Sequence, residues 1–294
     1  MNMGNIRKFH KVTGCKRYRL FFRISVLFLF TSLIITSCDK INEPYIQRTN
    51  NQTDTGVVVQ KVLLEDFTGH RCGNCPRAHE KIEELHGLYG DKVITIAVHA
   101  GFFAMTTTEY PTDYRSADGN AIASYFSVTD YPSGMVNRKE ESGQRLKPYT
   151  VWATMISEIL AQTPVLGISI TNNYNSTNRQ LQSTAKLEFK GIVDEQLKIC
   201  FFITEDSLIS PQTDYSLTPD KIDNYIHRHV LRGSMNGTWG DNLSASSYSA
   251  GDSLTVTKTV TLNSNWNENH CSVVVFVYSE SSEEIVQAEE KKVR

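Results

Sequence analysis

The sequence predicts an α/β domain followed by an all-β sandwich, and three observations support this division. The first half alternates continuous apolar runs with an amphipathic helical pattern, as strands joined by a helix do. The second half holds about seven short strand-like runs separated by turn residues. With 40% apolar and 21% charged residues, the 294-residue chain has the composition of a folded protein and enough length for two ordinary domains.

Residues 1–37 have the pattern of a secretory signal peptide. A basic stretch ends at Arg23, and the largely apolar run Ile24–Ile35 follows it. As a helix this run would span about 18 Å, too short for a bilayer core of roughly 30 Å. It leads into Ile35-Thr36-Ser37-Cys38, which resembles a bacterial lipobox, so Cys38 is expected to carry lipid. The alternative is an ordinary signal peptide, or a retained anchor, with an incidental cysteine.

The distribution of charge argues against nucleic acid as a partner. Residues 1–37 hold seven of the 30 basic residues and none of the 32 acidic ones, so the rest of the chain is acidic. A nucleic-acid partner would need clustered Lys and Arg. Residues 38–56 are polar and lack periodicity, which predicts a flexible tether. Beyond the N-terminus no uncharged apolar run reaches about 18 residues, which excludes a polytopic membrane protein.

The first domain is expected over residues 57–162. Val57–Phe67 and Val93–Ala100 are continuous apolar runs, typical of strands that are buried on both faces. Between them an apolar stripe at helical spacing begins at Cys75, and Gly90 ends this helix. The further elements expected are a short helix over 117–126, a strand that begins just after Pro132, and a last helix that opens at Pro148.

Four cysteines lie beyond the predicted signal peptide and lipid site, namely Cys72, Cys75, Cys200 and Cys271. An oxidising envelope compartment favours disulfides. The two-residue spacing pairs Cys72 with Cys75, which leaves Cys200 to pair with Cys271. The alternative is that Cys200 and Cys271 are two separate buried thiols. Strand alternation places Cys200 on the face opposite to that of its apolar neighbours.

The position of Cys72 and Cys75 at the start of a helix favours a reactive cysteine thiolate. Unpaired N–H groups and the helix dipole stabilise a thiolate there, and His70 and Arg71 add positive charge. Cys72 is therefore expected to be the exposed, attacking thiolate and Cys75 the buried, resolving thiol. Asp66, if it is buried beneath the pair, would take the proton from Cys75.

The run Asp66-Phe67-Thr68-Gly69-His70-Arg71-Cys72-Gly73-Asn74-Cys75 resembles the strand, turn and redox dipeptide of the thioredoxin superfamily. The resemblance covers about residues 57–162. It implies that Pro132 stands at the position of the superfamily's cis-proline, facing the cysteine pair. It also implies that Asp66 stands at the position of the buried, proton-shuttling aspartate.

Other interpretations of this domain stay open. Arg71 stands where the superfamily often has an aromatic residue, and Asn74 replaces its commoner Pro or His. The cysteine pair could be an inert structural disulfide, whereas a zinc site would need two more ligands and no second CxxC exists. The aromatic loop Phe102–Tyr114 follows the carboxyl end of a strand, and is either a substrate-contacting lid or a cover over the sheet edge. We predict no metal and no cofactor.

Residues 163–294 are expected to form an immunoglobulin-like β-sandwich. The mostly apolar runs Leu197–Thr204 and Cys271–Tyr278 predict its central strands. His227 and His229 share one face of a strand, which is either a polar strand face or a metal site. The further strands are expected around 166–170, 185–190, 227–232, 254–262 and 285–286.

The whole layout resembles one family. Lipobox, polar tether, CxxC domain and β-sandwich together are similar to the outer-membrane-protein-28 lipoproteins of Gram-negative anaerobes. The stretches DFTGHRCGNCPRAH, YPSGMVNR and HRHVLRGSMNGTWGD carry this resemblance, over about residues 57–294. It implies attachment to the outer membrane, with the periplasmic or the surface face undecided. Asp39 directly after Cys38 is a retention signal for the inner membrane in some bacteria.

Two functions of different class follow. The first is a membrane-tethered thiol–disulfide oxidoreductase that acts on envelope proteins, with Cys72 as nucleophile, Cys75 as resolver and Pro132 positioning a substrate strand. The second is a non-catalytic surface lipoprotein, an adhesin or binding module, in which the CxxC is a structural disulfide. An exposed Cys72 would favour the first, and a closed aromatic loop would favour the second.

Overall fold

The computed structural model describes residues 58–294, which belong to one compact unit. The predicted signal peptide, the lipidation of Cys38 and the tether over 38–56 all lie outside the described residues. From residue 58 onward, no helix combines the length and the apolar character that crossing a membrane requires.

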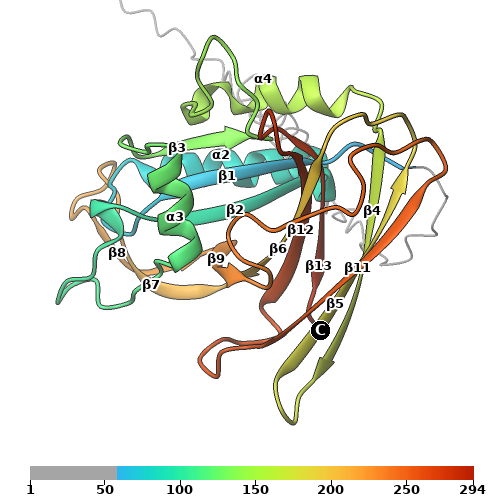
Figure 1. Ribbon diagram of the computed structural model, residues 1–294. Helices are drawn as coiled ribbons and strands as arrows, with labels where there is room; N and C mark the ends of the chain where they lie inside the picture. The colour runs from blue at the N-terminus through green and yellow to red at the C-terminus, as the bar shows by residue number, and fades with distance from the viewer. Residues whose placement is uncertain (1–57) are drawn as a thin grey trace, which may run out of the picture. The chain divides into compact units, whose positions relative to one another are not determined.

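The first elements follow the predicted order of strand, helix and strand (Figure 1). β1 (Val62–Thr68) and β2 (Val93–His99) are parallel neighbours. Every residue of both strands is buried, as their continuous apolar runs predict. Between them α2 (Cys75–Tyr89) ends at Gly90, whose φ of 61° lies in the left-handed region that glycine adopts readily.

Two helices and one strand complete this part of the chain. α3 (Ala117–Tyr125) and α4 (Tyr149–Leu160) confirm the two helices that were expected near these positions. β3 (Ser133–Val136) begins directly after Pro132 and pairs antiparallel with β1. Two short 3₁₀ helices follow α2 and β2, namely η1 (Gly90–Lys92) and η2 (Phe102–Ala104).

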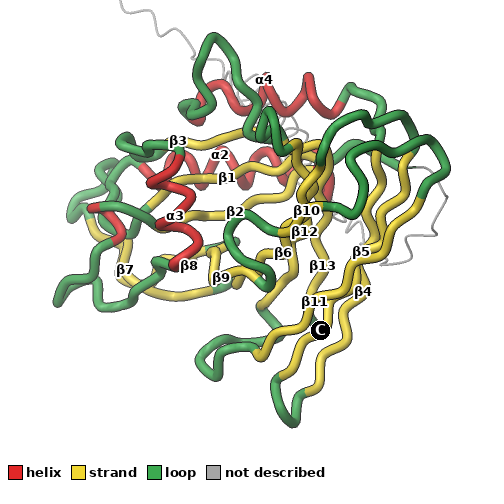
Figure 2. Tube along the Cα trace, viewed as in Figure 1, coloured by secondary structure: helices red, strands yellow, loops and turns green. Residues whose placement is uncertain are grey.

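After α4, the described residues form strands and loops, whereas the helices gather around β1, β2 and β3 (Figure 2). β6 (Leu197–Glu205) and β12 (Cys271–Ser279) are antiparallel neighbours and are buried along almost their whole length. The other strands are β4 (Leu166–Asn175), β5 (Gln180–Phe189), β7 (Leu208–Thr213), β8 (Lys221–His227), β9 (Val230–Ser234), β10 (Asp241–Asn242), β11 (Ser253–Thr261) and β13 (Ile285–Lys292).

One sheet runs through both predicted domains. Its strand order is β13-β12-β6-β9-β2-β1-β3, and β10 pairs with β6 beside this path. β9 is the joint, because it lies antiparallel to β6 and also pairs with β2, where Val230 meets Ala97. The boundary predicted between residues 162 and 163 therefore does not divide the sheet.

Three apolar clusters hold the layers together. α2 and α4 pack on one face of β1 and β3, around the fully buried Trp152. α3 contributes Ile122 and Ala123 to the cluster on the opposite face, which continues onto β6 and β12. The third cluster lies between the three-stranded sheet β11-β5-β4 and the other face of β6 and β12. The fold is thus rich in β-structure, with helices on both faces of one end of the large sheet.

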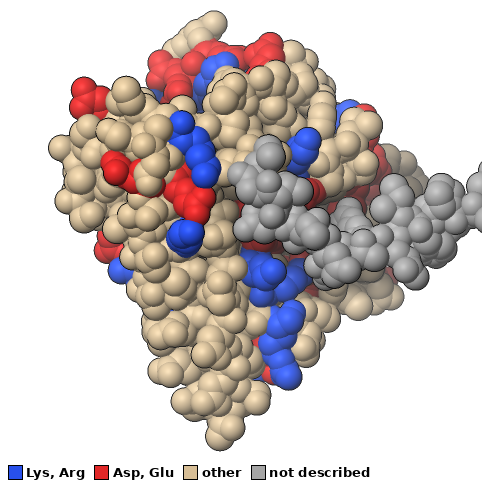
Figure 3. Space-filling view, turned by 90° about the vertical axis from the view of Figure 1, so that its right-hand side faces the viewer, with Lys and Arg blue, Asp and Glu red and all other residues tan. Residues whose placement is uncertain are grey.

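Charged side chains of both signs share the face drawn in Figure 3. Ion pairs among the described residues include Lys258 with Asp241 and Lys292 with Asp206, both at 2.8 Å. Mixed charge of this kind differs from the clustered Lys and Arg of a nucleic-acid surface. The exclusion of nucleic acid stays a prediction.

The β7–β8 hairpin is not among the elements that the sequence predicts. Leu208 and Ile209 begin β7, but Pro211 follows within two residues and breaks the strand pattern. In the structure the pairing of the two strands shifts between Ser210 and Gln212, at the proline. Such an irregularity accommodates a residue that has no N–H to donate.

Cys200 and Cys271 are separate buried thiols, so the disulfide predicted between them is not formed. They lie on neighbouring antiparallel strands, but Cys271 pairs with Glu205, five positions away from Cys200. Their side chains also leave opposite faces of the sheet, because Cys200 joins the cluster beside α3 and Cys271 the cluster between the sheets. Burial raises the pKa of each thiol to about 12, so both stay protonated at neutral pH.

Candidate functional site

The candidate site lies where β1 turns into α2. Cys72 and Cys75 form a disulfide, with 5.4 Å between their Cα atoms. α2 begins at Cys75, so Cys72 belongs to the turn before the helix. The side chain of Asn74 makes no capping hydrogen bond, and the first turn holds no acidic residue. The positive end of the helix dipole therefore acts on the cysteine pair without a competing carboxylate in that turn.

Cys72 is buried, which corrects the prediction that it is exposed. It is 2% exposed, and Cys75 is fully buried. His70 is buried as well, and this burial lowers its pKa, so His70 does not add the positive charge expected of it at neutral pH. The Arg71 guanidinium group lies over the ring of Phe102, 4.6 Å from the ring centroid.

Much of the cover comes from the β7–β8 hairpin, far along the chain. The Thr213 N–H donates to the His70 carbonyl oxygen at 2.9 Å. The side-chain amide of Gln212 donates to the Cys72 carbonyl oxygen, also at 2.9 Å. These bonds fasten the hairpin to the turn that holds the cysteines.

Tyr215, in the hairpin loop, lies directly on Gly73. The Tyr215 N–H donates to the Gly73 carbonyl oxygen at 2.9 Å. A Cβ atom at position 73 would come within 2.4 Å of the Tyr215 ring, closer than real Cβ contacts allow. A side chain at position 73 would therefore force the Tyr215 ring to move from this position.

The aromatic loop closes the site from another side. Its Phe103 carbonyl oxygen accepts a hydrogen bond from the Arg71 N–H at 3.0 Å. The ring of Tyr110 stacks on the ring of His70, with 5.4 Å between the centroids. The Tyr110 hydroxyl also lies 2.7 Å from the Thr213 hydroxyl, so the loop and the hairpin contact each other. In the structure this loop is folded down as a cover, which is the second of the two interpretations offered by the sequence.

Asp66 is fully buried on β1 and faces α2. Val62 and Leu64 pack against α2 and α4, and strand alternation places Asp66 on the same face. Neither carboxylate oxygen has a hydrogen-bond partner in the part of the chain that the structure describes. Its Oδ2 atom lies 3.5 Å from Nε2 of His79, one helical turn after Cys75.

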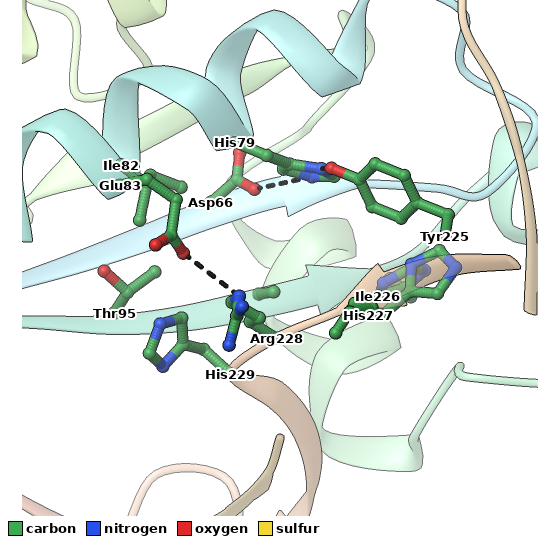
Figure 4. A pocket seen from close by; sticks show the side chains of 12 residues that line it. Asp66, His79, Ile82, Glu83, Thr95, Tyr225, Ile226, His227, Arg228 and His229 are labelled. Carbon is green, nitrogen blue, oxygen red and sulfur yellow. Dashed lines mark hydrogen bonds and ion pairs between the residues drawn. The ribbon is translucent and has the colours of Figure 1, made fainter. Parts of the chain in front are cut away.

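A pocket with a volume of about 90 Å³ lies beside Asp66, between α2, β2 and the end of β8 (Figure 4). Figure 4 shows the His79 ring between the Asp66 carboxylate and Tyr225. Nδ1 of His79 is 2.7 Å from the Tyr225 hydroxyl, and Nε2 is 2.9 Å from the Thr68 hydroxyl. The other residues that line the pocket are Ile82, Glu83, Thr95, Ala97, His99, Ile226, His227, Arg228 and His229.

Several of the pocket histidines are kept neutral by burial. Desolvation lowers the pKa of His227 to about 3 and that of His229 to about 4, and it lowers the pKa of His99 well below its usual value. His227 contacts the Ser210 hydroxyl through Nε2, whereas His229 lies beside Asp206. Over residues 58–294, no three or more His, Cys, Asp or Glu side chains are grouped so as to hold a metal ion.

Pro132 lies at the same end of the sheet as the cysteine turn. The Tyr131–Pro132 peptide bond is cis, the isomer that the resemblance implies. The next residue, Ser133, pairs with Phe67 near the end of β1, just before the turn that holds Cys72. The structure thus brings Asp66, Pro132 and the cysteine pair to one end of the sheet.

Two of the stretches that carry the family resemblance also contain residues that stabilise the fold. In YPSGMVNR, Arg138 donates two hydrogen bonds to Glu65, at 2.8 and 2.7 Å, and both side chains are buried. Arg138 also lies over the ring of Phe276, 5.2 Å from its centroid, which joins β1 to β12. In HRHVLRGSMNGTWGD, Ser234 and Thr238 donate to Asp118 at the start of α3.

Sequence reasoning missed four residues of this site: His79, Gln212, Tyr215 and Tyr225. A signal existed for His79, because it follows Cys75 by four residues and so shares its helix face. No local signal connected the hairpin to the cysteines, since 140 residues separate Gln212 from Cys72.

Comparison with known proteins gives the family. The profile of the family described as Outer membrane protein Omp28 matches residues 119–294. HBP35 of Porphyromonas gingivalis is 18% identical with a TM-score of 0.62, covering 80% of this chain and 76% of that chain, which shows a shared fold. A domain of the outer membrane lipoprotein Omp28 from Porphyromonas gingivalis is 19% identical with a TM-score of 0.30, covering 45% of this chain and 91% of that chain.

No curated protein matches the sequence. The residues matched by the family profile make up more than half of the chain, and they confirm the resemblance seen in the sequence. The chain therefore belongs to the outer membrane protein Omp28 family, and its location is the outer membrane.

Proposed function

We propose that this protein is a lipid-anchored thiol–disulfide exchange protein that acts on other envelope proteins through Cys72 and Cys75. The observation that supports this most is the combination of a disulfide at the start of α2 with the buried carboxyl group of Asp66 on the strand that faces that helix. Neither oxygen of this carboxyl group has a hydrogen-bond partner among residues 58–294. Cys38 is the proposed lipid attachment site, and residues 38–56 are the proposed tether.

In this proposal residues 57–162 have a thioredoxin-like arrangement, and residues 163–294 form an immunoglobulin-like sandwich that recruits partner proteins. The order β1, α2, β2, followed by β3 just after Pro132, supports the first assignment. Two sheets that face each other across one apolar cluster support the second.

The proposed chemistry is reversible disulfide exchange. In the oxidising direction a partner thiolate attacks Sγ of Cys72, the bond to Cys75 breaks, and the electron pair leaves on Cys75, which takes up a proton. A second partner thiolate attacks the partner sulfur that is bound to Cys72, so the partner leaves with a disulfide and Cys72 leaves as a thiolate. The reverse sequence reduces a partner disulfide. The helix dipole of α2 stabilises the Cys72 thiolate in both directions.

The reduction potential of the Cys72–Cys75 pair tests the proposal. The full chain, kept in detergent, is equilibrated against mixtures of reduced and oxidised glutathione, and alkylated thiols are counted by mass, with Cys72→Ser as the control. A potential between about −270 and −120 mV is expected, the range of exchange proteins. A potential below about −300 mV would mark a structural disulfide and contradict the proposal.

A second candidate function is favoured by the burial of Cys72. A disulfide that is 2% exposed and covered by both the hairpin and the aromatic loop also suits a structural staple. In that case the protein is a non-catalytic adhesin or binding module of the outer membrane. The same measurement separates the two functions, because a staple gives the lower potential.

A further inference from the structure

We propose that His79, positioned by Tyr225, carries protons between Asp66 and solvent during exchange at Cys75. This inference rests on the proposed function and deepens it. The resolving thiol is fully buried, and so is Asp66, so any proton that leaves Cys75 needs a carrier that reaches the surface.

His79 connects the buried site to the outside. It follows Cys75 by one turn of α2, so both side chains leave the same face of the helix. Its Nε2 atom lies 3.5 Å from Oδ2 of Asp66. The Asp66 side chain is fully buried, whereas the His79 side chain is 18% exposed. The His79 imidazole ring thus contacts the buried carboxyl group and also reaches the partly exposed pocket.

Both ring nitrogens of His79 have a partner that suits proton transfer. When Nδ1 carries the hydrogen, it donates to the Tyr225 hydroxyl oxygen at 2.7 Å. Nε2 then accepts from the Thr68 hydroxyl at 2.9 Å, and it takes a proton from Asp66 when that hydrogen bond is released. When Nδ1 accepts from the Tyr225 hydroxyl, Nε2 carries a hydrogen that faces Asp66 and the Thr68 hydroxyl. The contacts therefore fit both tautomers, which a proton carrier must visit in turn.

The transfer balances in the direction that reduces a partner disulfide. Cys72 first forms a mixed disulfide with the partner. Cys75 then gives its proton to Asp66, and its sulfur attacks Sγ of Cys72, while the partner sulfur leaves with the electron pair and takes a proton from water. Asp66 passes its proton to Nε2 of His79, and His79 releases a proton to solvent.

The charges around His79 come from several elements. Asp66 faces it from β1, Glu83 and Glu80 lie on its own helix, and Arg228 after β8 forms an ion pair with Glu83 at 3.3 Å. The nearby histidines are His99 on β2 and His227 on β8. Burial lowers the pKa of both His99 and His227, so these two rings do not take up protons near neutral pH.

The resolving step is measured directly in a single turnover. The reduced full chain in detergent is mixed with a short peptide disulfide, the reaction is stopped with acid at a series of times, and the mixed disulfide on Cys72 is quantified by mass. The first step forms this species and the resolving step consumes it. The series is repeated between pH 6 and pH 10.

In His79→Gln the mixed disulfide is expected to accumulate at pH 7, with resolution slowed about a hundredfold, the lower end of what positioned proton transfer supplies. The first step should keep its rate. Above about pH 9 the difference should disappear, because hydroxide then removes the thiol proton. Tyr225→Phe should slow resolution less, because it removes only the group that positions the ring.

His227→Gln is the matched control, because it changes another histidine of the same pocket whose Nε2 contacts Ser210. It should leave both steps unchanged. Equal resolution in His79→Gln and wild type at every pH, or equal slowing in His227→Gln, would overturn the role of His79 while leaving the exchange function intact. A slowing that persists at high pH would mean that His79 is only structural. A wild-type protein that forms no mixed disulfide would contradict the proposed function itself.

Discussion

Glu65 and Asp66 are neighbours on β1, yet the structure treats their carboxyl groups in opposite ways. Strand alternation sends the two side chains to opposite faces of the sheet. Glu65 meets Arg138 in a two-bonded ion pair, and both side chains are buried. Asp66 faces α2 without a hydrogen-bond partner among residues 58–294. The first carboxylate is therefore part of the structure, and the second is free for chemistry.

This contrast gives a prediction about stability. Glu65→Gln leaves Arg138 buried without its counter-charge, so the free energy of unfolding should fall by about 3–5 kcal/mol. Asp66→Asn removes a buried carboxylate that makes no hydrogen bond within residues 58–294, so it should leave the free energy of unfolding unchanged or raise it. Urea denaturation of both variants measures this. Equal losses in the two variants would contradict the assignment.

His227 gives a prediction about pH. Its folded pKa is lowered to about 3, mainly by burial, whereas in the unfolded chain it is about 6.5. As pH falls below about 6.5 the unfolded chain binds a proton that the folded chain refuses until about pH 3. The free energy of unfolding should therefore fall by about 1.4 kcal/mol per pH unit on account of this residue.

Urea denaturation at pH values from 7 to 4 checks this slope in wild type and in His227→Gln. As pH falls, the free energy of unfolding of the variant should decrease less per pH unit than that of wild type. Above pH 7 the two proteins should show the same pH dependence. Parallel slopes in the two proteins would show that His227 titrates normally.

At the scale of elements, local patterns predicted β1, α2, β2, α3, α4 and most later strands. Continuous apolar runs and the cap at Gly90 depend on neighbouring residues, so the sequence displays them directly. The β7–β8 hairpin was missed because Pro211 interrupts its pattern. The exposure of Cys72 was mispredicted for the same reason, since the hairpin supplies part of its cover. The cysteine motif could be recognised in the sequence, but the segments that cover it could not be predicted.

The hairpin gives the next prediction. In Tyr215→Ala the ring that lies on Gly73 is lost, so a small thiol should reduce the Cys72–Cys75 disulfide several-fold faster. Stopped alkylation and mass analysis follow this rate. Leu217→Ala is the matched control, because it removes an exposed side chain of the same loop and should leave the rate unchanged. Equal rates in Tyr215→Ala and wild type would mean that the hairpin does not limit access.

At the scale of the whole molecule, the two predicted domains share one sheet. β9 from the second half pairs with β2 from the first, and the pocket beside Asp66 is lined from both halves. The sequence could not show this, because pairing between distant strands leaves no local periodicity. The division at residue 162 follows the change in pattern along the chain and not the architecture.

A fragment of residues 57–162 should therefore not fold by itself. It would leave one edge of β2 unpaired and the cysteine turn without its hairpin. Circular dichroism and amide hydrogen exchange of the fragment are expected to show a largely unprotected chain, in contrast to the full chain. A fragment with cooperative unfolding and protected β1 and β2 amides would contradict the prediction.

The remote origin of the hairpin has a consequence in time. A chain that is threaded across a membrane N-terminus first delivers Cys72 and Cys75 well before Gln212, which follows 140 residues after Cys72. During that interval the two sulfurs are accessible to any oxidant in the compartment. The hairpin that contains Gln212 then folds over the cysteine pair and covers it. If the chain is exported in this order, the Cys72–Cys75 disulfide is expected to form before the hairpin covers it.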